Sequence, residues 1–418
     1  LISKQNNGMI KVITGLRRCG KSFLLFELYR DYLISSGVPE NNILCIPLDD
    51  VDYEEYCDPH KLHTYIKEQV NDPEQQYYVF IDEAQYAISK EEMKNPDVPI
   101  RLYGVLNSLL RKRNVDVYIT GSNSKFLSSD IMTEFRGRGD EVHIAPLSFS
   151  EYFPASGLNK MDAWKEYLYY GGLPHILAEM GDEAKSNYLE KLNREIYLRD
   201  IYERYDMREE AGMESLMKVV ASAVGSLTNP QKISATFMSS GYKGISIPTI
   251  SNYLKYLQES FVIQKAERYD IKGRKYIGTP SKYYYSDLGL RNSLLNFRQF
   301  EETHLMENAI YNELIYRGYN VDVGVVEVRQ DEDGKRVRKQ MEVDFVVNQS
   351  NRRYYIQSAF ALPDREKVEQ EQESLVKIPD SFKKIIVVGD NSPIWRNEEG
   401  VTIIGIYDFL LNNNSLDL

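Results

Sequence analysis

The chain has 418 residues, of which 42% are hydrophobic and 27% are charged, and this is typical of a folded globular protein of about three domains. No apolar run is long enough to cross a bilayer, so an integral membrane protein is excluded and we expect a cytoplasmic one. The net charge of −11 excludes a surface that is basic throughout, so any contact with nucleic acid must come from a local patch.

A glycine-rich segment joins the first predicted strand, residues 9–14, to a predicted amphipathic helix, residues 23–35. This segment reads G-L-R-R-C-G-K-S, which is a complete Walker A motif. Its glycines let the backbone wrap around phosphates, and the start of the helix offers free N–H groups. The sequence therefore predicts a site for ATP and Mg²⁺, in which Lys21 reaches the β- and γ-phosphates and the Ser22 hydroxyl binds Mg²⁺. The residues expected to contact the nucleotide are Gly15, Leu16, Arg17, Arg18, Cys19, Gly20, Lys21, Ser22 and Phe23.

Two further apolar runs, residues 43–48 and 77–81, predict the next strands of the same domain. The second run leads directly into Asp82 and Glu83, which is the Walker B pattern. Such a strand delivers its carboxylates to the sheet edge where ligands of open α/β folds bind. We expect Asp82 to hold Mg²⁺ through water and Glu83 to orient or deprotonate the attacking water.

Two more candidate catalytic positions follow a predicted strand at residues 115–120. Ser122 or Asn123 suits a sensor beside the γ-phosphate, although the same residues also suit a helix N-cap. Arg138, ahead of Arg136, suits an arginine finger that acts on the site of another chain, because a planar guanidinium matches the charge that develops during phosphoryl transfer. An ordinary pair of surface arginines is the alternative, and the oligomeric state is left open.

Taken in order, these motifs resemble those of a prokaryotic family of AAA-type ATPases. The resemblance extends to residues 146–152 (P-L-S-F-S-E-Y), 169–174 (Y-Y-G-G-L-P) and 282–290 (K-Y-Y-Y-S-D-L-G-L), so it covers nearly the whole chain. It implies an α/β fold class with a winged helix and a C-terminal nuclease-like module. The implied domains are a P-loop parallel-sheet ATPase domain at 1–155, a helical lid or linker at 156–210, a winged helix at 211–292, and an α/β restriction-endonuclease-like domain at 293–418.

The sequence itself also has the pattern of a winged helix. Residues 246–249 carry the start signals of a helix, and residues 261–269 and 282–285 read as strands on either side of a basic turn. In the functional interpretation, the helix that begins at Thr249 enters a DNA major groove. The phosphate contacts would then come from the turn residues Lys272, Arg274 and Lys275. The same pattern equally fits a winged helix that is used only for protein packing.

The C-terminal part resembles the PD-(D/E)xK nuclease core, in which an Asp, a Glu-x-Lys pair and a helical Glu gather a divalent metal. Glu307 and Asp344 match this pattern. Gln357 and Ala359 stand where the Glu and the Lys belong, so one metal-binding charge and the residue that polarises the attacking water are both absent. We therefore expect an inactive nuclease fold.

The leading hypothesis is an ATPase that works as a molecular switch, producing ADP and phosphate. Its nucleotide state would change how the winged helix and the nuclease-like module engage DNA or a protein partner. One alternative is a nucleotide-binding scaffold for protein partners with slow turnover. Another is an ATP-gated nuclease, which requires a metal at Glu307 and Asp344.

Overall fold

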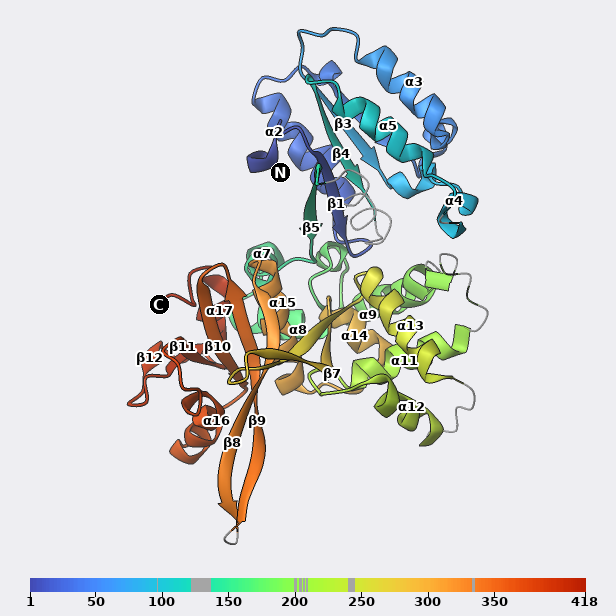
Figure 1. Cartoon of the computed structure of the whole chain (residues 1–418). Helices are drawn as coiled ribbons and strands as arrows, with labels where there is room; N and C mark the ends of the chain where they lie inside the picture. Colours follow the sequence, from blue (N-terminus) through green and yellow to red (C-terminus); the bar gives the residue numbers. More distant parts are fainter. Residues whose placement is uncertain are drawn as a thin grey trace. The chain divides into compact units, whose positions relative to one another are not determined.

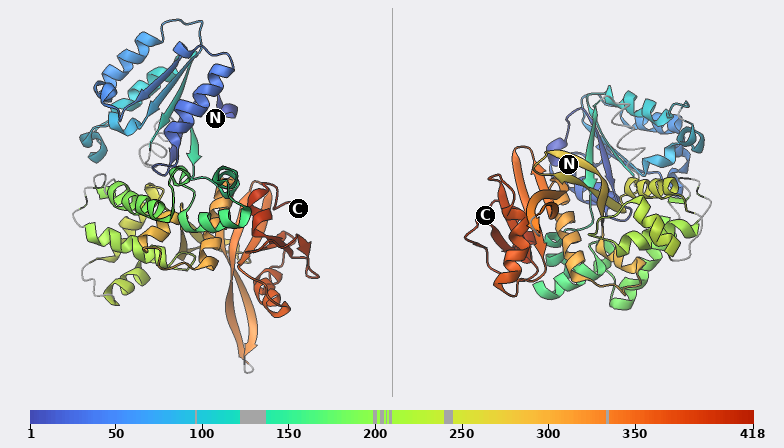
Figure 2. Two further views of the ribbon diagram at one scale, coloured as in Figure 1. Left: turned by 180° about the vertical axis from the view of Figure 1, so that it is seen from behind. Right: turned by 60° about the horizontal axis from the view of Figure 1, so that its bottom comes forward.

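The computed structural model describes residues 1–95, 97–121, 137–198, 201–202, 205, 207, 210–239, 245–332 and 335–418. The chain forms two compact units, which we describe separately (Figures 1 and 2). The first unit comprises Leu1–Ala145 with Glu259–Phe261, and the second comprises Pro146–Gln258 with Val262–Leu418. None of the described helices has the length and apolar character needed to span a membrane.

The first unit is built on a parallel five-stranded sheet with the order β2-β3-β4-β1-β5. The parallel α/β sheet expected for this part of the chain is thus confirmed. Strand β4 lies between β1, which precedes the glycine-rich loop, and β3, which ends in Asp82. The carboxyl ends of these three strands therefore meet at one edge. The strand bounds are Ile10–Gly15 (β1), Ile43–Pro47 (β2), Tyr77–Asp82 (β3), Val115–Thr120 (β4) and Gly139–Ile144 (β5).

Helices cover both faces of this sheet, because successive residues of each buried strand point to opposite sides. Val79 and Ile81 of β3 share a core with α3 (Pro59–Gln69) and α5 (Arg101–Leu110). Phe80 shares the opposite core with the helical stretch that follows the glycine-rich loop. That stretch consists of α1 (Lys21–Phe23), η2 (Leu24–Tyr29) and α2 (Arg30–Ser35). The unit also contains the short helical elements η1 (Ile2–Lys4), η3 (Glu40–Asn42), η4 (Val51–Cys57), η5 (Ala84–Ala87) and α4 (Lys90–Lys94).

A buried polar network ties this helical stretch to the sheet. The Lys11 ammonium forms an ion pair with the Asp116 carboxylate, and both side chains are almost fully buried. The Tyr118 hydroxyl donates to Asp116 at 2.8 Å, and it lies 2.6 Å from the hydroxyl of Tyr29. A buried charge must be paired and hydrogen-bonded to be tolerated, so the network fixes Tyr29, and with it the loop-bearing helix, against β1 and β4.

The second unit begins with helices. They are α7 (Phe149–Ser156), α8 (Lys160–Tyr170), η7 (Pro174–Leu177), α9 (Asp182–Lys191) and η8 (Leu192–Leu198). Two of the segments that carry the family resemblance, residues 169–174 and 282–290, meet here, because the N–H of Gly172 donates to the Asp287 carboxylate at 2.7 Å. A side chain at Gly289, in α14 (Leu288–Leu294), would place its Cβ 2.0 Å from the carbonyl oxygen of Tyr170. This close approach explains why glycine stands at that position.

Within the described residues, helices and a hairpin follow. The helices are α11 (Glu210–Ser222), α12 (Pro230–Ser239) and α13 (Ile247–Glu259), and the strands are β6 (Ile263–Asp270) and β7 (Lys275–Tyr285). Helix α13 buries Ile250, Tyr253, Leu254 and Leu257. The hairpin is not isolated, since β6 also pairs in parallel with β8 and so joins the sheet of the C-terminal part.

That sheet has eight strands in the order β12-β13-β11-β10-β9-β8-β6-β7. Helix α15 (Glu302–Tyr316) packs on one face within a core that also contains Trp164 of α8, and α16 (Arg365–Val376) packs on the other face. One hydrophobic core contains residues of both α8 and the C-terminal sheet, so it does not separate the predicted domains. The domain boundaries at 210 and 292 stay predictions. The remaining elements are β8 (Asn320–Glu332), β9 (Lys335–Gln349), β10 (Arg352–Ala359), β11 (Lys383–Val388), β12 (Trp395–Arg396), β13 (Thr402–Gly405) and α17 (Ile406–Leu411).

Candidate nucleotide-binding site

The loop between β1 and α1 has a backbone that its glycines make possible. Gly15 has a φ of 145° and Gly20 a φ of 101°, both in the region that side chains disfavour. A Cβ at Gly15 would lie 2.1 Å from the carbonyl oxygen of Ile144 on β5, so no larger residue fits there. Gly20 occupies the position before the helix, which leaves the first helical N–H groups directed toward the loop. The loop therefore has the form of an anion cradle.

Lys21 is the positive charge of this cradle. Its side chain is buried, and its ammonium donates to the carbonyl oxygens of Gly15 at 3.1 Å and Leu16 at 3.0 Å. These two acceptors hold the side chain in place across the loop without cancelling its charge. A phosphate that entered the loop would meet a lysine that is already ordered, which lowers the entropic cost of binding.

Asp82 and Glu83 lie beside the loop, at the carboxyl end of β3, and a third residue connects them. The hydroxyl of Thr120, the last residue of β4, donates to the Asp82 carboxylate and accepts the backbone N–H of Glu83 at 3.0 Å. Thr120 and Asp82 are both buried. Thr120 is not among the residues that the sequence predicts for the site, although its position at the end of a strand, before Gly121, is a usable signal. Ser122, Asn123 and Arg136 lie outside the described residues.

The environment of Glu83 makes its carboxylate more basic than usual. Burial raises its pKa, and this effect outweighs the nearby Lys21 charge and the hydrogen bond that the Gln85 side chain donates to Glu83. Its φ of 50° places the backbone in the left-handed region, which is costly for a residue with a side chain. A strained, partly buried carboxylate with raised basicity has the properties required of a general base.

The described residues around Asp82 fit a magnesium ion that is shared with a nucleotide. Asp82 offers carboxylate oxygens and Ser22 an exposed hydroxyl in the first helical turn, and Mg²⁺ prefers oxygen ligands. Within the described ranges, no group of three or more His, Cys, Asp or Glu residues is arranged to hold a metal. An ion held by the Ser22 and Asp82 oxygens would take its other ligands from water and phosphate.

The other predicted site residues differ in burial and in position. Phe23 and Arg18 are exposed, Arg17 is partly buried, and the Cys19 thiol is buried and donates to the carbonyl oxygen of Ile144 at 3.3 Å. Burial raises the pKa of this thiol, which keeps it protonated. Arg138 is exposed at the start of β5, where its carbonyl accepts the N–H of the first residue of β1. It therefore lies at the sheet edge opposite to the loop, roughly 15–20 Å away along the strand.

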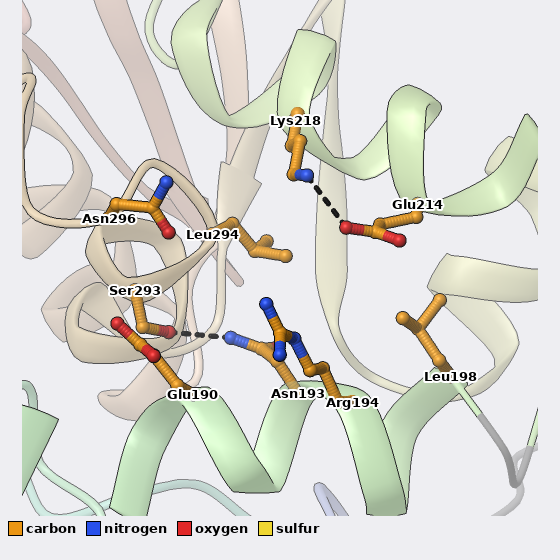
Figure 3. Close-up of a pocket in the computed structure, with 9 residues that line it drawn as sticks. All are labelled: Glu190, Asn193, Arg194, Leu198, Glu214, Lys218, Ser293, Leu294 and Asn296. Atoms are coloured by element: carbon orange, nitrogen blue, oxygen red, sulfur yellow. Dashed lines mark hydrogen bonds and ion pairs between the residues drawn. The ribbon is translucent and has the colours of Figure 1, made fainter. Parts of the chain in front are cut away.

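The second unit contains a small pocket between α9, η8, α11 and α14, which Figure 3 shows. Its volume is about 30 Å³, and its walls carry two polar contacts: Asn193 donates to Ser293 at 2.6 Å, and Lys218 pairs with Glu214 at 2.6 Å. A volume of this size holds about one water molecule. This pocket is therefore too small to be a second nucleotide site.

The predicted carboxylates of the C-terminal part do come together. Glu307 on α15 and Asp344 on β9 are buried, and both contact the ammonium of Lys282. The Gln357 side chain accepts the N–H of Asp344 at 3.4 Å. Ala359 packs in the apolar core beneath α16. The inactive nuclease fold stays a prediction, and Lys282 is a member of the cluster that the sequence did not reveal.

Comparisons with known proteins agree with this picture of the first unit. Residues 7–153 match the family described as AAA domain, and residues 161–301 match a domain of unknown function. An uncharacterized protein of Haemophilus influenzae is 33% identical over 417 residues, which cover 98% of this chain and 96% of that protein. The chain belongs to the family of that protein. The first unit of this family member is an AAA domain, a P-loop fold that binds nucleotides.

Two other similar proteins come from archaea. An uncharacterized protein of Methanocaldococcus jannaschii is 27% identical over 359 residues, covering 82% of this chain and 73% of that protein. The structure of a Walker-type ATPase of Pyrococcus abyssi aligns with a TM-score of 0.46 and 14% identity, covering 70% of this chain and 93% of that one.

Proposed function

We propose that this family member is an ATP hydrolase whose first unit acts as a nucleotide-dependent switch. The observation that carries the proposal is that Lys21, Asp82, Glu83 and Thr120 meet at one sheet edge, with the ammonium ordered and the carboxylates linked through one hydroxyl. A site that only held nucleotide would need the cradle and the lysine. It would not need a second, strained carboxylate beside them.

Each residue of the site has its own role in the proposed hydrolysis of ATP. The loop N–H groups and Lys21 bind the β- and γ-phosphates. Ser22 and Asp82 would hold a Mg²⁺ ion, which would supply further positive charge at this site. Glu83 orients a water molecule and accepts its proton as the water oxygen bonds to the γ-phosphorus. The bond from that phosphorus to the bridging oxygen breaks, and ADP and inorganic phosphate leave. Thr120 keeps Asp82 and the backbone of Glu83 in fixed register during the reaction.

A winged helix formed by α11 to β7 is the part that we propose to engage DNA. Its hairpin turn exposes Lys272, Arg274 and Lys275, and the buried face of α13 leaves Ser251 and Asn252 exposed on the other side. Lys272 donates to the carbonyl oxygen of Glu327 at 2.9 Å, which orders the side chain and retains its charge. An ordered, exposed cluster of positive charge suits the phosphate backbone of nucleic acid in a chain that is acidic overall.

Measuring ATP hydrolysis by the full chain, with and without DNA, tests the proposed activity. Lys21→Ala should abolish hydrolysis and weaken nucleotide binding, whereas Glu83→Gln should abolish hydrolysis and leave binding nearly unchanged. Lys61→Ala, which removes an exposed lysine of the same unit, is the matched control and should leave both unchanged. Hydrolysis by Lys21→Ala at the wild-type rate would refute the proposal. Binding without any turnover would favour the scaffold that recognises protein partners.

A further inference from the structure

The carboxylate cluster of the second unit already contains a cation. The ammonium of Lys282 lies 2.8 Å from Glu307 Oε1, 2.8 Å from Glu342 Oε1 and 3.5 Å from Asp344 Oδ1. A lysine ammonium has three hydrogen-bond donors, and here they face three carboxylates from a helix and a strand. We propose that Lys282 is the resident cation of this cluster, so that the wild-type chain excludes a divalent metal and loss of the ammonium creates a divalent-metal site.

The position of Lys282 is fixed by the fold. Lys282 lies on β7 opposite Ala266 of β6, and the preceding residue, Ser281, exchanges two backbone hydrogen bonds with Thr228. Two residues further along, the Tyr284 hydroxyl donates to Glu307 Oε1 at 2.6 Å. The backbone beside Lys282 and the carboxylate of its partner Glu307 are therefore both fixed, and the buried lysine side chain has little freedom to leave.

The two cations are mutually exclusive. A divalent ion would take the same carboxylate oxygens at about 2.0–2.6 Å, and its centre would then fall within about 3 Å of the ammonium nitrogen. Two like charges at that separation, away from bulk water, repel strongly. The Lys282 ammonium thus takes the place that a divalent ion would occupy among these carboxylates, and it supplies the positive charge that balances them.

The surroundings would accept an ion once the ammonium is gone. The Asp344 carboxylate is oriented by the N–H of Ser358 at 2.9 Å, and the Ser358 hydroxyl is buried without a hydrogen-bond partner among the described residues. Glu342 is about one-third exposed, which gives the point access to solvent. With Lys282 in place, these carboxylates are not among groups arranged to hold a metal in the described part of the chain. Without the ammonium, the carboxylate oxygens around this point, with water as the further ligands, would suit Mn²⁺ or Mg²⁺.

The test is Mn²⁺ binding to the nucleotide-free full chain, measured by electron paramagnetic resonance and by the melting temperature. Wild type should bind no Mn²⁺ at this cluster. Lys282→Ala should bind one ion per chain, with affinity at least roughly 100-fold above any wild-type binding, and its melting temperature should rise with Mn²⁺ concentration. Adding Asp344→Asn to Lys282→Ala should remove this ion.

A second variant covers the case in which three unpaired carboxylates prevent Lys282→Ala from folding. Lys282→Ala with Glu342→Gln carries one negative charge fewer and keeps Glu307 and Asp344, and it should still gain Mn²⁺. A folded Lys282 variant that binds no Mn²⁺ would overturn the proposal. So would a wild-type chain that binds one Mn²⁺ and loses it on Asp344→Asn, and this measurement needs no Lys282 variant.

Discussion

The backbone N–H of Glu83 donates to the hydroxyl of Thr120 at 3.0 Å, although the two residues are 37 positions apart. The same hydroxyl donates to Asp82, so one side chain of β4 touches both acidic positions of β3. Any shift of β4 relative to β3 would therefore move the proposed Mg²⁺ ligand and the proposed base together.

Replacing Thr120 by Val keeps the shape of the side chain and removes the hydroxyl. We expect kcat for ATP hydrolysis to fall by about 10- to 100-fold with little change in nucleotide affinity, because the cradle and Lys21 are untouched. Thr120→Ser keeps the hydroxyl and should retain most of the rate. The measurement is kcat together with a separate nucleotide titration, and a wild-type kcat in folded Thr120→Val would show that the hydroxyl has no role in positioning.

Gly15→Ala should disrupt the loop and not merely weaken it. The new Cβ would overlap the carbonyl oxygen of Ile144, and the φ of 145° disfavours any side chain, so we expect a loss of about 3 kcal/mol or more in unfolding free energy together with loss of nucleotide binding. Gly104→Ala is the matched control. Gly104 lies within α5, with no heavy atom of the described residues within 4 Å of a built Cβ. That change should raise stability by about 0.5–1 kcal/mol. Equal melting temperatures for the two variants would contradict this account.

The parts of the site that were predictable from the sequence are those whose geometry is local. The loop and Lys21 occupy eight consecutive residues, and Asp82 and Glu83 follow one apolar strand, so spacing alone indicates them. Thr120 depends on which strands are neighbours, and that order is set by packing over the whole sheet. Lys282 is separated from Glu307 by 25 residues and from Asp344 by 62, so only the assembled sheet reveals their contact.

Asp287 should make stability depend on pH. It is buried and accepts the N–H groups of Gly172 and Leu290, and burial raises its carboxyl pKa to about 6. Because the folded-state pKa exceeds the unfolded value, the stabilisation from this carboxyl is complete below about pH 4 and is lost as the pH rises to about 6. Asp287→Ala should therefore cost more unfolding free energy at pH 5 than at pH 7, by roughly 1 kcal/mol.

Denaturant unfolding at the two pH values, at equal ionic strength, measures this difference. Asp364→Ala, which removes the exposed N-cap carboxylate of α16, is the control for loss of a capping carboxylate. A loss on Asp287→Ala that is equal at the two pH values, or larger at pH 7, would show that the buried carboxyl does not titrate in this range.

Arg138 is predicted to act on the site of another chain, since it lies at the sheet edge away from its own loop. Arg138→Ala should lower kcat by about 10³-fold or more, because arginine fingers contribute about 10³- to 10⁵-fold. Mixing it with Lys21→Ala, which has an intact Arg138 and an inactive site, should restore part of the activity. Arg111→Ala, an exposed arginine of the same unit, is the control. No recovery on mixing, over the concentrations at which wild type hydrolyses ATP, would refute the assignment.

The basic turn of the hairpin predicts a salt dependence for any binding of duplex DNA. Each phosphate that is neutralised contributes about 0.9 to the slope of log affinity against log salt concentration, so replacing Lys272, Arg274 and Lys275 by Ala should reduce the slope by up to about 3. The matched control replaces Arg352, Arg365 and Lys367, which are basic residues elsewhere on the second unit. Because the turn belongs to the second unit, ATP hydrolysis without DNA should be unchanged in both triple variants. An unchanged slope in the hairpin variant would show that phosphates are contacted elsewhere, and it would favour the alternative in which the proposed winged helix serves protein packing.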